Sequence, residues 1–183
     1  MPSLAERLDN YLVKYIAYFN YKSYANRLNL QGNEQILEVG SGGGNLSRFL
    51  AKKIPNGRLV CLDNSEYWID KSRKRLEGFR NIDFILRDML NFSEENSFDI
   101  VVVHYVLHDL EEKEKFINIL SKSLRGGGRI HIREPTRKNH GMPSADIEEL
   151  MFSVGSENLS SREGYSFPLR GKVYEGVFSK VPK

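Results

Sequence analysis

Cysteine is almost absent from this chain, which has one, Cys61, in 183 residues. A single cysteine cannot form an internal disulfide, and it cannot build a site that needs several thiolates. Cys61 lies within the apolar segment Arg58–Asp63, so we interpret it as a buried thiol rather than a reactive one. The sequence therefore predicts a protein of a reducing compartment, and we expect a cytoplasmic location.

Long hydrophobic runs are also missing. No apolar stretch approaches the roughly 20 residues that a membrane span needs. The first residues, Met1–Glu6, have neither a basic segment nor an apolar core, so they do not resemble a signal peptide. The net charge of +3 is mild and does not favour nucleic acid as a partner. The four histidines lack the spacing of metal ligands, and we predict no metal site.

Glycine is concentrated in one segment, and the rest of the chain is organised around it. Residues 35–39 are mostly apolar, with little alternation of polar and apolar positions, which predicts a buried strand. Residues 46–54 have apolar positions at helical spacing, which predicts a helix. Between them stand Gly40, Ser41, Gly42 and Gly44, with Glu38 inside the strand. Glycine permits positive φ and lets a ligand lie against bare backbone. The segment therefore predicts a nucleotide-sized binding corner at the end of a strand.

The glycine spacing separates two kinds of nucleotide site. A dinucleotide fingerprint would read Gly-x-Gly-x-x-Gly, whereas position 45 here is Asn45. The pattern Glu38-x-Gly40-x-Gly42-x-Gly44 instead resembles the first motif of the class I S-adenosylmethionine-dependent methyltransferases. The resemblance implies that Glu38 lies near the cationic methionine part of the cofactor and that Gly40, Ser41 and Gly42 line it.

Two further acids follow the next two predicted strands. Asp63 ends the strand at 58–63, where a carboxylate can bind ribose hydroxyls, and its neighbour Asn64 is a further candidate for cofactor binding; the alternative for Asp63 is capping of the following helix. Asp88 and Met89 follow the third strand. The resemblance implies that Asp88 accepts from the adenine amine and that Met89 packs on the ring, although an Asp after a strand is also ordinary turn chemistry.

The most apolar run, residues 98–104, predicts a parallel strand buried on both faces and resembles the family's fourth motif. His104 and Tyr105 stand at its end, beside the expected sulfonium, and are our candidates for catalysis; the alternative for His104 is to shape the pocket or to bind the cofactor through its backbone. His108 follows and is a candidate for substrate contact or for packing at a strand–helix junction. His131, in the middle of the fifth strand, we interpret as a satisfied core residue.

The remaining segments complete a recognisable order. The glycines at 126–128 we interpret as a helix end and turn, and residues 157–165 and 172–180 as two closing strands. The resemblance implies an α/β, Rossmann-like fold: a seven-stranded, mostly parallel sheet with helices on both faces and the last strand antiparallel. Residues 3–29 predict a helix, so we divide the chain into an N-terminal helical cap, 1–30, and a cofactor-binding domain, 31–183. The cap's Tyr11 and Tyr15, and His140 in a polar loop, are further substrate candidates.

Taken together, the motifs predict a methyltransferase that uses S-adenosylmethionine, releases S-adenosylhomocysteine, and acts on a small molecule, as in the quinone-biosynthesis branch. An RNA or protein methyltransferase remains an alternative, although no Asn-Pro-Pro-Tyr follows the fourth strand and Cys61 is on the wrong strand to attack cytosine. A catalytically silent cofactor-binding subunit is another. An NAD oxidoreductase is disfavoured by Asn45 and Glu38. The acceptor and the oligomeric state have no signature in the sequence.

Overall fold

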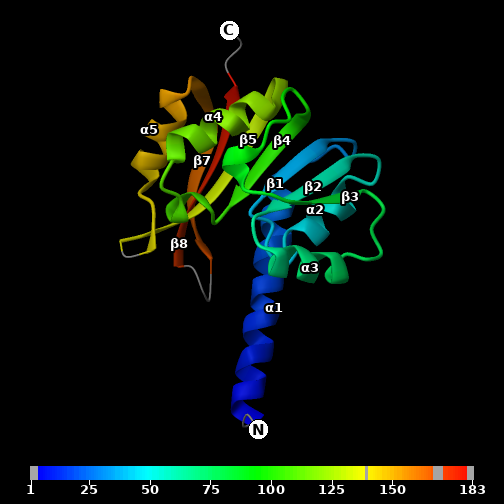
Figure 1. The fold of residues 1–183 in the computed structure, drawn as a ribbon. Helices are drawn as coiled ribbons and strands as arrows, with labels where there is room; N and C mark the ends of the chain where they lie inside the picture. Colours follow the sequence, from blue (N-terminus) through cyan, green and yellow to red (C-terminus); the bar gives the residue numbers. More distant parts are fainter. Residues whose placement is uncertain (1–3, 139, 167–170, 181–183) are drawn as a thin grey trace.

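The computed structural model describes residues 4–138, 140–166 and 171–180, and Figure 1 shows a twisted sheet flanked by helices. The strands of its main path are β1 (Gln35–Val39), β2 (Arg58–Asp63), β3 (Ile82–Leu86), β4 (Phe98–His104), β5 (Leu124–Arg137), β7 (Ser156–Ser166) and β8 (Gly171–Lys180). The short β6 (His140–Gly141) pairs with β5 off this path. The helices are α1 (Leu4–Arg27), α2 (Ser47–Lys53), α3 (Glu66–Arg75), α4 (Lys113–Ser123) and α5 (Ser144–Ser153), with 3-10 turns η1 (Met89–Asn91) and η2 (Leu107–Asp109).

The strand order is β3-β2-β1-β4-β5-β8-β7. Strands β1 to β5 pair in parallel, whereas β8 runs antiparallel to both β5 and β7. The predicted seven-stranded, mostly parallel sheet with an inserted antiparallel last strand is therefore confirmed. Because β1 and β4 run in parallel, their carboxyl ends and the loops that follow them lie at one edge of the sheet, which is where ligands bind in such folds.

Alternate residues of each central strand feed two apolar layers, as expected for strands covered on both faces. On one face Leu37 and Val101 pack with the helices α4 and α5. On the other face Ile36 and Val102 pack with α1 and α2, through residues that include Tyr24 and Leu50. The prediction of helices on both faces is confirmed.

The glycines at 126–128 do not form the predicted turn. Helix α4 ends at Ser123 and β5 begins at Leu124, so the glycines belong to the strand. The pairing of β4 with β5 shifts there, from Phe98 opposite Leu124 to Ile100 opposite Arg129. Extra residues on one strand make a bulge, and Gly127 takes the positive φ of +76° that such an irregularity needs. Strand β5 therefore begins at Leu124, before the glycines, and is longer than the sequence suggested.

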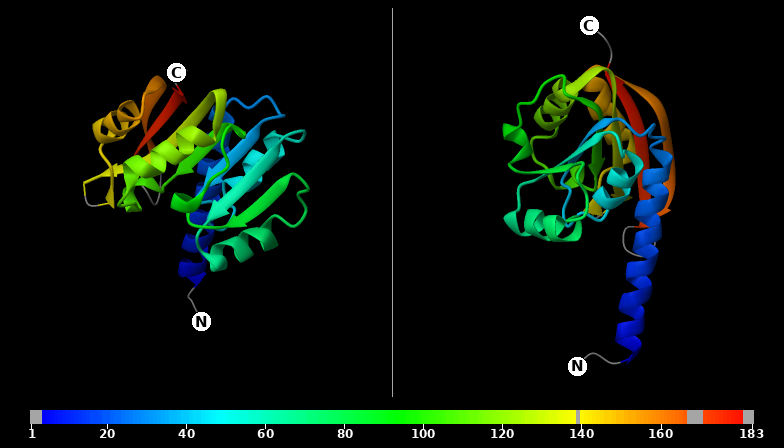
Figure 2. Two further views of the ribbon diagram at one scale, coloured as in Figure 1. Left: turned by 45° about the horizontal axis from the view of Figure 1, so that its top comes forward. Right: turned by 90° about the vertical axis from the view of Figure 1, so that its right-hand side faces the viewer.

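Helix α1 joins the body through its last turns. Tyr24 and Ala25 are buried, as is Leu28 directly after the helix, and Arg27 makes two hydrogen bonds to Glu175 of β8. The first half of α1 projects away from the sheet in both views of Figure 2. In the described part of the chain, no helix is both long enough and apolar enough to cross a membrane. Whether the helix is a separate cap stays a prediction.

Candidate active site

A pocket of about 530 Å³ opens at the carboxyl ends of β1, β2 and β4. A smaller pocket of about 100 Å³ adjoins it towards the end of β3. Five residues line both: Gly40, Asp63, Asn64, Val106 and Leu110. The two spaces therefore form one elongated site, with Glu38 and His104 at one end and Asp88 and Met89 at the other.

The floor of this site is the glycine turn. The amides of Gly40 and Ser41 both donate to the carbonyl of Leu62, at 2.8 and 3.1 Å, which holds the turn against β2. Gly40 has a φ of +65°, and a Cβ built on it would lie 2.5 Å from Cγ2 of Val106. Glycine is required at this position for two independent reasons, backbone conformation and close approach of the loop after β4.

Glu38 is a carboxyl group inside the sheet, 2% exposed, at the methionine end predicted for the cofactor. The thiol of Cys61 lies beside it, with Sγ 3.8 Å from Oε2. Burial raises the pKa of Glu38 to about 8. A buried carboxyl with no cation beside it costs less when protonated, so this residue is suited to receive a positively charged group.

Asp63 lines the pocket and does not cap the following helix, whose N-cap is Ser65 and has no side-chain cap. One carboxylate oxygen accepts from the amide of Gly42 at 2.8 Å, and the other accepts from the amide of Ser65 at 3.0 Å. Each oxygen retains a lone pair, so ribose binding stays a prediction. Nearby, the hydroxyl of Ser41 is buried in the same pocket with no hydrogen-bond partner among the described residues. Buried hydroxyls rarely lack a partner, which points to a ligand there.

Asp88 and Met89 lie together in the smaller pocket, as predicted for the adenine end. Asp88 also accepts from the amide of Leu90 at 2.9 Å and begins η1. Met89 is buried, and Leu62 and Phe116 line the same space. The arrangement is an apolar slot with a carboxylate at its rim, which fits a planar ring bearing an amine.

His104 is surrounded by three tyrosine rings. Its ring centroid lies 4.0 Å from Tyr105, 5.3 Å from Tyr24 and 5.4 Å from Tyr21. Tyr21 and Tyr105 also line the large pocket. Electron-rich ring faces attract cations within about 6 Å, so this end of the site suits the positively charged reaction centre predicted there.

Tyr105 has a backbone conformation that is uncommon for its residue type. Its φ is +63°, its amide donates to the carbonyl of Arg133, and its hydroxyl donates to Ser166 Oγ at 2.9 Å. A bulky residue in the left-handed region is strained, and such strain clusters at functional sites. These two hydrogen bonds join the residue after β4 to β5 and β7; the catalytic role of Tyr105 stays a prediction.

His108 lies at the strand–helix junction that its alternative reading expected. Its Nδ1 lies 2.6 Å from Oε2 of Glu134, and its side chain is nearly buried. The remaining oxygen of Glu134 accepts from the amides of Val106 and Leu107 at 2.6 and 2.8 Å. His108 is absent from the residues that line the two pockets, so the structure favours packing over substrate contact.

The other predicted substrate residues are less informative. Tyr15 is 54% exposed and packs edge-on against Phe19, away from both pockets. The side chains of Tyr11 and His140 lie outside the described residues. Sequence reasoning missed Tyr21, Asp109 and Trp68 as lining residues; Trp68 is 40% exposed and lies over the glycine turn. Among the described residues, no group of three or more metal-binding side chains lies together.

Comparison with known proteins settles the family. A family model described as a methyltransferase domain matches residues 30–165. This chain belongs to that methyltransferase family. It is 32% identical over 102 residues to the demethylmenaquinone methyltransferase of Clavibacter sepedonicus, a match that covers 55% of this chain and 41% of that one. The chain spans less than half the length of the first curated relatives it matches, at 42%, 35% and 37%.

Solved structures of other methyltransferases have the same fold. A SAM-dependent methyltransferase from Aquifex aeolicus has a TM-score of 0.80 at 15% identity, covering 91% of this chain and 92% of that one. The N-methyltransferase NodS from Bradyrhizobium japonicum, solved with S-adenosylhomocysteine, has a TM-score of 0.75 at 21% identity, covering 89% and 87%. The predicted fold class is therefore confirmed for this chain.

Proposed function

We propose that this methyltransferase binds S-adenosylmethionine in the elongated site and transfers its methyl group to a small-molecule acceptor near His104. The cofactor supplies an already activated methyl group, so the protein's task is chiefly to bind, orient and exclude water. The observation that carries the proposal is the combined pocket, in which a buried carboxyl, a glycine turn, a strand-end carboxylate and an apolar slot follow one another.

The residues present fit the proposed cofactor. Glu38 would pair with the cationic amine, and the unpartnered Ser41 hydroxyl would bond to the amino-acid part. Asp63 would accept from the ribose, because both its oxygens are already aimed by backbone amides. Asp88 and Met89 would hold the adenine. A side chain at position 40 would fill the space that the ligand and Val106 share.

The acceptor end is the rim formed by Tyr21, His104 and Tyr105. His104 would remove a proton from an oxygen or nitrogen nucleophile if the acceptor carries one. Two of the relatives are named for small molecules, tetrahydroprotoberberine and demethylmenaquinone, and this supports an acceptor of that class, on the quinone-biosynthesis branch. The single cysteine supports a reducing, cytoplasmic setting.

The experiment is calorimetric titration of the purified protein with S-adenosylhomocysteine, with NADH in parallel. We expect binding of the first ligand only. Asp63→Ala should weaken it at least tenfold, whereas Asp83→Ala, which removes an exposed carboxylate from β3, should leave it unchanged. Failure of the intact protein to bind would overturn the cofactor assignment.

The acceptor class is tested separately by supplying radiolabelled S-adenosylmethionine with a low-molecular-weight metabolite extract, with total RNA and with total protein. Label in the small-molecule fraction alone is the expected result. Label in RNA or protein would replace the small-molecule proposal with the corresponding alternative. Tight cofactor binding with no label anywhere would favour a silent subunit.

A further inference from the structure

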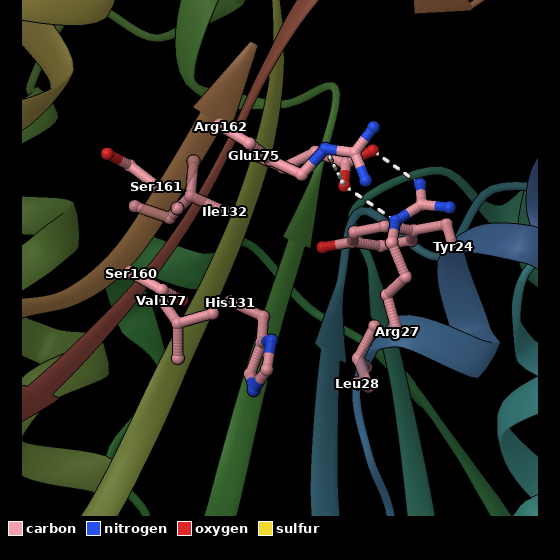
Figure 3. A pocket seen from close by; sticks show the side chains of 11 residues that line it. Tyr24, Arg27, Leu28, His131, Ile132, Ser160, Ser161, Arg162, Glu175 and Val177 are labelled. Carbon is pink, nitrogen blue, oxygen red and sulfur yellow. Dashed lines mark hydrogen bonds and ion pairs between the residues drawn. The ribbon is translucent and has the colours of Figure 1, made fainter. Parts of the chain in front are cut away.

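A second pocket, of about 290 Å³, lies on the sheet face that α1 covers, away from the cofactor site. Figure 3 shows its lining side chains, which come from α1, β5, β7 and β8. Arg27, Arg162 and Glu175 gather at one end, and Leu28, His131 and Val177 lie at the other. The pocket therefore has a charged end and a largely apolar end.

The charged end holds more positive than negative charge. Both oxygens of Glu175 are engaged by Arg27, at 2.9 and 2.6 Å. Nε of Arg133 lies 3.1 Å from the same carboxylate, and its side chain is only 3% exposed. One carboxylate thus serves three guanidinium groups, the third being Arg162.

Arg162 is the loosest of the three. Its Nε lies 3.8 Å from Oε2 of Glu175, beyond hydrogen-bonding distance, and its side chain is 55% exposed. Its donors are consequently available to a further acceptor. An arginine beside a partly apolar wall recognises a carboxylate or phosphate well, because its planar fork donates two parallel hydrogen bonds.

Polar groups without partners provide an independent sign of a ligand. His131 is buried, and its Nε2 has no hydrogen-bond partner among the described residues; the same is true of the hydroxyl of Tyr24. His131 is thus buried as predicted but not satisfied. Burial, assisted by the positive charge of Arg129, lowers its pKa to about 3, so the ring is neutral and can donate or accept. Two unpaired groups lining one pocket are unusual in a folded protein.

We propose that this pocket is a second ligand site, which binds a small organic anion: a carboxylate or phosphate held by Arg162 and Arg27, with an apolar body against Leu28 and Val177. His131 and Tyr24 would contact polar atoms of that body. A volume of about 290 Å³ is at the lower end of the range for small-molecule sites, so the ligand is of the size of a substituted aromatic acid.

The second pocket shares no lining residue with the cofactor pocket, but residues of the two sites contact each other. Tyr24 contacts the ring of His104, and the guanidinium of Arg133 lies 5.5 Å from the ring centre of Tyr105. A ligand in the second pocket would therefore contact Tyr24, which in turn contacts His104 at the acceptor end. The proposal does not depend on methyl transfer, since it concerns binding alone.

The test is nuclear magnetic resonance of the full-length, ¹⁵N-labelled protein during titration with benzoate, with phenyl phosphate, and with the neutral analogue benzamide. We expect saturable shifts of the amides of Ser160, Gly176 and Val177 with at least one anion, and much weaker effects of benzamide. Arg162→Ala should weaken anion binding about tenfold or more, as loss of a charged hydrogen bond does. The matched control Arg58→Ala, at another exposed ion pair, should change nothing.

A second variant tests whether binding depends on the pocket itself and not only on the overall charge. Ser160→Trp keeps every charge but fills the pocket, and it too should abolish binding. The proposal is overturned if neither anion shifts these amides, if benzamide binds as well as benzoate, or if the shifts fall instead on Gly42 and Met89. It is also overturned if Arg162→Ala alters the sedimentation coefficient, which would make this surface an interface between copies. Titration of Arg162→Ala with S-adenosylhomocysteine should match the unmodified protein, so failure here is distinct from failure of the proposed function.

Discussion

Glu134 of β5 and His108 of η2 form a buried pair, with Oε2 of the carboxylate 2.6 Å from Nδ1 of the ring. The other carboxylate oxygen accepts two backbone amides of the same loop. This one side chain therefore fixes the segment 106–108, and Val106 of that segment lines both parts of the cofactor site. The precision of the site depends on a contact between elements 26 residues apart in sequence.

The first prediction concerns these contacts of Glu134, which we call the Glu134 latch. Glu134→Ala leaves two backbone amides and the His108 ring without their buried acceptor, so we expect the free energy of unfolding to fall by about 3 kcal/mol. Binding of S-adenosylhomocysteine should weaken as the loop loosens. Urea unfolding and calorimetry measure the two effects. Glu112→Gln, at an exposed pair with Lys115, is the control and should change stability by less than about 1 kcal/mol. Equal stability of the two variants would refute the role of the latch.

The second prediction separates the two reasons for glycine at position 40. Gly40→Ala brings a methyl group to 2.5 Å from Cγ2 of Val106, in addition to the strain of a φ of +65°. Gly42 has a comparable φ of +51° but open space around it. We expect Gly42→Ala to cost about 1 kcal/mol from strain and Gly40→Ala about 1 to 3 kcal/mol more from the clash.

A double-mutant cycle tests this reason directly. Val106→Ala removes the clashing methyl group, so the pair Gly40→Ala with Val106→Ala should be more stable than the sum of the single changes predicts. Thermal unfolding of the four proteins gives the coupling. Strict additivity would mean that backbone strain alone dictates the glycine.

The third prediction follows from the protonation of Glu38. Its pKa is about 8 in the folded protein against an ordinary value of 4.5. Between these values the folded state holds a proton that the unfolded state releases, so this group's contribution to stability falls as pH rises through the window. Glu38→Gln removes the dependence. We expect the variant to become more stable relative to the unmodified protein as pH rises from 5 to about 8, measured by urea unfolding.

The same group links cofactor binding to proton release. A cationic ligand amine favours the carboxylate form of Glu38, so binding at pH 7 should release part of a proton. Calorimetry in two buffers of different ionisation enthalpy detects this release. The Glu38→Gln variant should bind more weakly and release none from this position. An unchanged proton count in the variant would place the coupling elsewhere.

Much of the fold could be predicted from local sequence patterns. The strand, glycine turn and helix at 35–53, and the apolar run of β4, follow directly from residue periodicity, because each depends on neighbours in sequence. The prediction of a turn at the glycines 126–128 was wrong, because a bulge inside a strand and a turn before a strand need the same backbone freedom.

Contacts between distant elements were not predictable from such patterns. Nothing in the sequence around Glu134 or His108 signals that they pair, and nothing around Arg27, Arg133 and Arg162 signals that they share Glu175. These relationships arise only when β5, β7, β8 and α1 are brought together. The sequence singled out Tyr11 and Tyr15 of α1, whereas Tyr21 and Tyr24 are the ones beside His104, because only the later turns of the helix reach the sheet.

The last prediction distinguishes a proton-transfer role of His104 from a merely shaping one. His104→Phe keeps an aromatic ring among Tyr21, Tyr24 and Tyr105 but removes the nitrogen atoms. If His104 is a general base for the acceptor found in the metabolite screen, methyl transfer should fall about 100-fold or more while the Kd for S-adenosylhomocysteine changes little. The pH–rate profile should lose its acidic limb, because that limb reports protonation of the base. Tyr21→Phe, which retains the ring and removes only a hydroxyl, is the control and should keep the profile. Full activity of His104→Phe would leave the ring, rather than its nitrogens, as what the reaction requires.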